Sequence, residues 1–146
     1  MKRKIFTLLL TVGLSTYVFG GDRFVRDDSK EVVIDNATNL IWQDDSDAKT
    51  VKKTWQEAIN YCKNLTLGEY NDWYLPNYNQ LYSIVSLTSL PKINLTFQNT
   101  FGQYYWSSTT LASNSSYAWR VRFGGGSDYW SSKSVKHNVR CVRDNN

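Results

Sequence analysis

The sequence is poor in the residues from which catalytic sites are most often built. Its 146 residues include one His, two Cys, one Met and two Pro. With a single His, at position 137, neither a multi-histidine zinc site nor a Ser-His-Asp triad can be built elsewhere in the chain. His137 shares its expected strand side with Val139 and Cys141, so we interpret it as structural. No pair of carboxylates stands out as a glycosidase pair. The sequence therefore predicts neither an enzyme nor a cofactor.

Metal-binding motifs are also scarce. Asp44, Asp45 and Asp47 lie close together in a charged stretch, which raises the possibility of calcium. However, the spacing lacks the glycine and the distal glutamate of a helix–loop–helix calcium site. A solvated loop over residues 44–53 is the favoured interpretation, and no metal site is predicted.

The chain has no uninterrupted apolar run long enough for a membrane span. Lys2, Arg3 and Lys4 precede a mostly apolar stretch, residues 5–19, that is short and interrupted. Val18 and Gly20 then fit the −3 and −1 positions of a cleavage site. This pattern is typical of a bacterial secretory signal, with an uncleaved anchor as the alternative. We predict a signal peptide at residues 1–20 and one domain at residues 21–146, located in the periplasm, secreted or at the bacterial cell surface.

The expected mature domain has little net charge. Without residues 1–20, Lys plus Arg falls from 17 to 14 while Asp plus Glu stays at 13. The high pI of the full chain is therefore no argument for a nucleic-acid partner. The charge is uneven, because residues 120–146 hold 6 basic and 2 acidic side chains. A basic surface, if the domain has one, is expected in this C-terminal segment.

Only Cys62 and Cys141 are available for a disulfide. In an exported chain an even pair of cysteines predicts a bridge, although free thiols remain an alternative. Such a bridge would close a loop of about 80 residues, which the chain-entropy account values at roughly 4–5 kcal/mol. It would join the first expected helix to the last expected strand.

The hydrophobic pattern predicts short strands and two helices. Thr54 with Glu57, and Asn77 with Gln80, are typical of capping boxes that begin helices at residues 54–65 and 78–85. Between the helices, an extended segment should place Trp73 and Leu75 on one face. Strands are expected at residues 23–26, 31–34, 40–43, 104–109, 117–123 and 135–143. The predicted core includes Trp42, Trp55, Trp73, Leu75, Trp106 and Trp119.

Alternation along the last two strands predicts a basic surface. Arg120 and Arg122 alternate with Val121 and Phe123, so they should face away from the core. By the same rule Lys136 and Arg140 should face away from Val139 and Cys141. If the two strands pair, the candidate anion-binding residues are Arg120, Arg122, Lys136 and Arg140; the alternative is a solvated strand face.

Several segments, in order, resemble the Lcl C-terminal domain family, named for a domain of a bacterial collagen-like adhesin. They include residues 35–42 (DNATNLIW), 54–58 (TWQEA), 72–77 (DWYLPN), 105–109 (YWSST) and 139–143 (VRCVR). Asn39 stands where Gly is usual, and Tyr74 where Arg is usual. The resemblance implies an α+β, C-type lectin-like fold with two helices flanking a small antiparallel sheet and one long-range disulfide.

The resemblance also implies a function. The named adhesin's domain is associated with sulfated glycosaminoglycans, and the calcium-dependent sugar motifs of C-type lectins are absent from this sequence. The chain is therefore expected to be an adhesion module for an anionic glycan that acts without calcium. The alternative is a structural or protein-interaction domain of the envelope that uses exposed aromatics such as Tyr104, Tyr129 and Trp130. A homo-oligomer is one form that this alternative allows.

Overall fold

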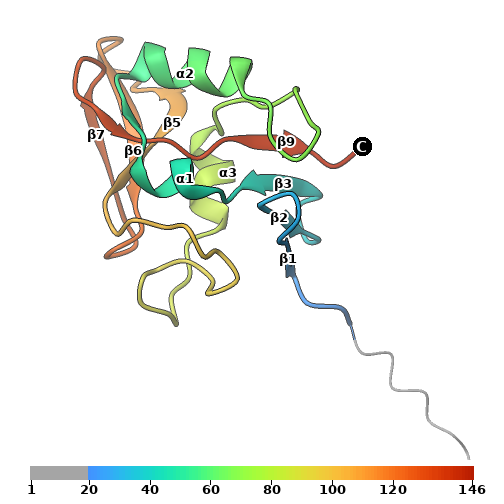
Figure 1. Ribbon diagram of the computed structural model, residues 1–146. Coiled ribbons are helices and arrows are strands. Elements are labelled where there is room, and N and C mark those ends of the chain that lie inside the picture. Colours follow the sequence, from blue (N-terminus) through green and yellow to red (C-terminus); the bar gives the residue numbers. More distant parts are fainter. Residues whose placement is uncertain (1–19) are drawn as a thin grey trace, which may run out of the picture.

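The computed structural model describes residues 20–146 (Figure 1), so the predicted signal peptide lies outside the described residues apart from Gly20. One antiparallel sheet has the order β1-β2-β3-β9. Its strands are β1 (Phe24–Asp27), β2 (Val32–Asp35), β3 (Leu40–Gln43) and β9 (Val142–Asp144). A second sheet has the order β4-β8-β5-β6-β7. Its strands are β4 (Lys52–Lys53), β8 (His137–Asn138), β5 (Tyr104–Thr110), β6 (Tyr117–Arg122) and β7 (Ser127–Ser132).

Three short helices accompany these sheets in residues 20–146: α1 (Ser46–Thr50), α2 (Trp55–Asn64) and α3 (Tyr78–Ser83). The expected α+β, C-type lectin-like arrangement of two helices flanking one small sheet is therefore wrong. The described chain is mostly β, with nine strands in two sheets. The expectation missed β7, in which the two aromatic residues, Tyr129 and Trp130, are adjacent and do not alternate with polar ones; the strand pairs with β6 over its whole length.

The two predicted capping boxes are present at the starts of α2 and α3. The Glu57 carboxylate accepts a hydrogen bond from the Thr54 backbone N–H at 2.9 Å, and α2 starts at the next residue. The Gln80 side chain accepts one from the Asn77 backbone N–H, also at 2.9 Å, at the start of α3. Residues 44–53, expected as loop, contain α1 because the Asp45 side chain caps its first turn.

Helix α2 lies across one end of the molecule, and a long loop between α3 and β5 projects from the other (Figure 1). The core has two clusters. One contains Trp42, Tyr105 and Phe123, and the other Trp73 and Trp106. Trp42, Trp73, Leu75 and Trp106 are buried, whereas Trp55 and Trp119 are only half-buried.

Cys62 and Cys141 form the expected disulfide, with a sequence separation of 79 residues. The bridge ties α2 to the final segment of the chain within the second core cluster. The segment that contains Trp73 meets the same final segment. Tyr74 and Val142 exchange two backbone hydrogen bonds of 2.9 Å each. This is an isolated bridge and not the extended strand that the sequence predicted.

The expected single strand over residues 135–143 is divided. Its first part, β8, belongs to the five-stranded sheet and its last part, β9, to the four-stranded sheet. Residues 138–143 between and within them are all buried. Because this segment crosses the interior from one sheet to the other, it has no solvent-facing side, and alternation cannot assign one.

Candidate functional site

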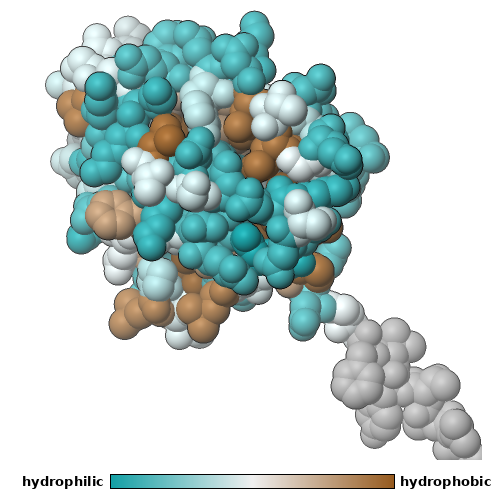
Figure 2. Space-filling view, in the orientation of Figure 1, coloured by the Kyte–Doolittle hydropathy of each residue, from teal (hydrophilic) through white to brown (hydrophobic). Residues whose placement is uncertain are grey.

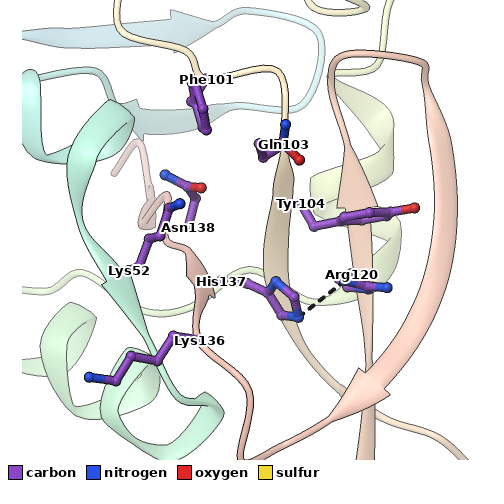
Figure 3. Close-up of a pocket in the computed structure, with 8 residues that line it drawn as sticks. All are labelled: Lys52, Phe101, Gln103, Tyr104, Arg120, Lys136, His137 and Asn138. Carbon is purple, nitrogen blue, oxygen red and sulfur yellow. Dashed lines mark hydrogen bonds between the residues drawn. The ribbon is translucent and has the colours of Figure 1, made fainter.

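An open depression lies over four neighbouring strands of the five-stranded sheet (Figure 3). Its volume is about 350 Å³. Strands β4, β8, β5 and β6 each contribute to it, and the loop before β5 adds Phe101 and Gln103. The lining residues, which we call the basic depression, are Lys52, Phe101, Gln103, Tyr104, Arg120, Lys136, His137 and Asn138. Three of them are cations and none is acidic, so the depression has positive potential.

Arg120 is the central cation of the basic depression. Its guanidinium carbon lies 3.7 Å from the centre of the Tyr104 ring, and one terminal nitrogen lies 3.2 Å from Nε2 of His137. Its Nε atom is buried and has no hydrogen-bond partner. Burial lowers the pKa of Arg120 from its ordinary value, but a guanidinium remains charged at neutral pH. Stacking and the histidine therefore hold a cation in place without neutralising it.

This lack of a counter-ion sets Arg120 apart from most arginines in residues 20–146. Four others form ion pairs with aspartates: Arg23, Arg26, Arg140 and Arg143. The fifth, Arg122, lies two residues along the same strand and forms no ion pair either. Its guanidinium carbon is 6.0 Å from the Tyr104 ring centre. The two arginines without carboxylate partners therefore lie around one tyrosine ring.

His137 is held neutral by its surroundings. Burial, together with the charges of Arg120 and Lys52, lowers its pKa to about 4. Because an arginine can only donate, Nε2 of His137 is the acceptor in their contact. The Ser131 hydroxyl also lies 2.9 Å from that atom. His137 lies between Arg120 and the buried Trp106 ring, so it orients the Arg120 cation and also packs against the core.

The lowered pKa of His137 predicts a loss of stability in weak acid. The unfolded chain binds this proton near the ordinary pKa of 6.5, whereas the folded chain binds it only near 4. The contribution of neutral His137 to the free energy of unfolding is therefore fully present above about pH 6.5 and is lost as the pH drops towards 4. After discounting for partial exposure, this contribution is on the order of 1–2 kcal/mol. Urea unfolding at several pH values measures the slope.

Replacement of His137 by Gln should flatten this slope, because the chain has no other His. Asp35 and Asp72 also have lowered pKa values. Because their ordinary pKa is 3.8, their effect on the free energy of unfolding falls mainly below pH 4 and not between pH 6.5 and 4. An unchanged slope between pH 6.5 and 4 in His137→Gln would contradict the assignment.

The other cations of the basic depression are exposed. The Lys52 ammonium lies 5.4 Å from the Phe101 ring centre and points into the depression beside Asn138 (Figure 3). The side chain of Lys136 leaves the backbone at the rim of the depression, and its ammonium points away from the other seven residues (Figure 3). Lys136 therefore adds charge at longer range, while Lys52 and Arg120 face the space itself.

The expected solvent-facing position of Arg140 is wrong. Its side chain is fully buried, because the final segment crosses the interior at this point. One terminal nitrogen donates to the Asp44 carboxylate at 2.9 Å, and the other donates to the Asn99 carbonyl at 2.7 Å. Asp44 also pairs with Arg26. Of the four predicted anion-binding residues, the structure places Arg120, Arg122 and Lys136 in or next to the basic depression and puts Arg140 in the core.

The acidic residues at positions 44–47 also have internal partners. Asp44 accepts hydrogen bonds from the backbone N–H groups of Gln98 and Asn99 as well as from two arginines. Asp47 accepts one from the Tyr61 hydroxyl at 3.1 Å. In the described part of the chain, no group of three or more His, Cys, Asp or Glu side chains is placed to hold a metal ion.

Sequence reasoning missed Lys52 and His137 as site residues, and it named Tyr104 only as an aromatic for a protein interface. Lys52 lies in a strand of only two residues, and the alternation pattern predicts a structural role for His137. They meet because Lys53 pairs with His137 in β8, which lies beside β5. No local sequence signal predicts those pairings.

The profile of the Lcl C-terminal domain matches residues 31–143. The chain belongs to the Lcl C-terminal domain family. Membership of this family indicates an extracellular, adhesin-associated domain. No curated protein matches the sequence. Across residues 20–146, no helix has the length and apolar character needed to span a membrane.

Proposed function

We propose that this Lcl C-terminal domain is an exported, non-catalytic binding module that holds an anionic glycan in the basic depression. The observation that supports it most is Arg120, a half-buried guanidinium that has no carboxylate partner and whose Nε atom has no hydrogen-bond partner. The planar donors of arginine match the oxygens of sulfate and carboxylate groups. An anionic group placed beside Arg120 would supply the missing partner.

Aromatic rings favour a sugar over a simple ion. Tyr104 and Phe101 stand beside Arg120 and Lys52. Both rings offer an apolar face, and Tyr104 adds a hydroxyl, which suits a ligand that has both C–H surfaces and polar substituents. The family context, an extracellular adhesin-associated domain, supports the same class of ligand. We place the protein in the bacterial periplasm or at the cell surface.

The proposed recognition does not use calcium. Calcium would need several oxygen ligands from carboxylates and carbonyls. The acidic residues at positions 44–47 best resemble such a site. The Asp44 carboxylate, however, already pairs with Arg26 and Arg140, so its oxygens are not available to a metal ion. The positive lining of the basic depression would also repel a cation.

Heparin is a suitable polyanionic probe for this proposal. The purified protein should be retained on heparin at low salt and released as salt is raised, because exposed charges are screened within about 8–10 Å at physiological ionic strength. The double variant Lys52→Gln/Arg122→Gln should bind up to about thirtyfold more weakly, at about 1 kcal/mol per exposed ionic contact. Arg120 stays unchanged, because its replacement would also disturb the fold.

The matched control is Lys49→Gln/Lys63→Gln, which removes the same charge from exposed positions on α1 and α2. It should bind heparin almost as the unmodified protein does. Equal losses in the two double variants would show that net charge alone drives retention. No retention at low salt would refute the proposal itself.

A protein-interaction role is the second candidate, supported by the loop between α3 and β5. Leu87, Leu90 and Leu95 on this loop are between 74% and 81% exposed. Figure 2 shows apolar side chains gathered where the loop projects from the body. Absence of heparin binding, together with self-association in sedimentation experiments, would favour this role.

A further inference from the structure

Three exposed leucines lie close together in sequence on the loop between α3 and β5. Leu87 is 81% exposed, Leu90 76% and Leu95 74%. They belong to residues 86–96, which we call the leucine loop, and this loop projects from the body of the molecule (Figure 1), where apolar side chains gather on the surface (Figure 2). Clustered exposed apolar side chains mark a site of contact with a protein or a membrane.

The leucine loop is anchored at its base. Ile93 and Phe97 are buried in the core. Val85 and Ile93 form an isolated antiparallel bridge, and the Lys92 backbone N–H donates to the Phe123 carbonyl. The exposed leucines therefore stand on a loop that is fixed to the protein, and they do not pack back into it.

Several polar groups beside the leucines are hydrogen-bonded within the loop itself. The Ser86 N–H donates to the Lys92 carbonyl at 2.9 Å, and the Lys92 ammonium donates to the Leu87 carbonyl at 3.1 Å. The Ser89 hydroxyl donates to the Ile93 carbonyl at 2.6 Å. A backbone polar group without a partner costs far more free energy in lipid than in water. These internal bonds lower the cost of moving the loop out of water.

The charges of this region suit a lipid surface. Residues 73–127 contain no Asp or Glu, and Lys92 is the only charged residue within the leucine loop. Phospholipid head groups carry phosphate, which attracts a lysine and repels a carboxylate. A lysine next to apolar side chains can lay its stem along them and keep its ammonium at the level of the head groups.

We propose that the leucine loop inserts into the surface of a phospholipid bilayer, with Leu87, Leu90 and Leu95 among the acyl chains and Lys92 at the head groups. Attachment of this kind strengthens with the apolar area that is inserted. A protein partner fits less well, because stable interfaces bury about 800 Å² on each partner and depend mostly on Trp, Tyr and Arg, with Leu under-represented. Residues 86–96 contain no aromatic residue and no arginine. This membrane contact does not depend on glycan binding in the basic depression.

Flotation of the purified protein with vesicles of phosphatidylcholine and phosphatidylglycerol tests the contact. The protein should float with the vesicles, and part of the binding should persist at high salt, because salt screens charges but not apolar insertion. Leu87→Ser/Leu95→Ser should lower the salt-resistant partition coefficient by at least about tenfold. Because both side chains are exposed, this variant should keep its fold and its retention on heparin.

Val25→Ser/Val135→Ser is the matched control, because both valines are 44% exposed and lie outside the leucine loop. It should bind vesicles as the unmodified protein does. Lys52→Gln/Arg122→Gln should also keep the salt-resistant binding, so a failure of the glycan proposal would leave this result unchanged. The membrane contact is refuted if the unmodified protein does not float at high salt, if the leucine variant floats as well as the valine variant, or if the leucine variant only loses self-association.

Discussion

Removal of the Cys62–Cys141 disulfide should lower the free energy of unfolding by about 4–5 kcal/mol. The bridge joins residues 79 apart in sequence, and in the chain-entropy account the cost to the unfolded state grows with the logarithm of that length. Both sulfurs are buried in the core cluster around Trp73. Because a domain commonly has only 5–15 kcal/mol of stability, the loss is a large share of the total.

The variant to measure is Cys62→Ala/Cys141→Ala, because alanine adds no polar group to the core. Urea unfolding of the oxidised protein, the reduced protein and the variant should give a markedly lower midpoint for the last two. A loss below about 1 kcal/mol would show that the unfolded chain is already restricted in the same region, contrary to the loop-entropy argument.

Replacement of Asp44 by Ala should cost about 3–5 kcal/mol, because it leaves a buried charge without its partner. Arg140 is fully buried and pairs with Asp44 at 2.9 Å, and Arg26 contacts the other carboxylate oxygen. Asp44 also accepts from the backbone N–H groups of Gln98 and Asn99. Its loss therefore also leaves these two backbone N–H groups without their acceptor, although Arg140 still donates to the Asn99 carbonyl.

Asp28→Ala provides the control for Asp44→Ala. Asp28 pairs with the same Arg26, at 2.6 Å, but its side chain is 80% exposed. A surface pair of this kind contributes at most about 1 kcal/mol. Denaturant midpoints should therefore separate the two variants clearly. Similar midpoints would mean that burial of Asp44 does not determine its contribution.

The parts of the fold that were predicted correctly have local signals. The hairpin β1–β2, the strand β3 and the starts of α2 and α3 are encoded by turn residues and capping boxes within a few positions. The disulfide follows from the presence of a single cysteine pair. Asn39 is a further case: its φ is +55°, a left-handed conformation that Asn tolerates and Gly favours.

The parts that were predicted wrongly depend on contacts between distant segments. Alternation fails after residue 137, because the chain there is buried on both sides and Arg140 points into the protein. Strand β7 has no alternation of apolar and polar residues and is defined by its pairing with β6. The basic depression joins Lys52, Tyr104, Arg120 and His137 from four strands, and their proximity follows from the sheet order and not from any motif.

The most direct test of the proposed function is an NMR titration with a heparin-derived oligosaccharide that observes the arginine Nε–Hε signals. The Nε of Arg120 has no hydrogen-bond partner in the structure, so an anion bound beside it should shift that signal strongly. Backbone signals of Phe101, Tyr104 and Asn138 should move with it, and those of the buried Arg140 should not. Shifts confined to other surfaces, with the Arg120 signal unchanged at saturation, would contradict the proposal that the basic depression is the anionic-glycan site.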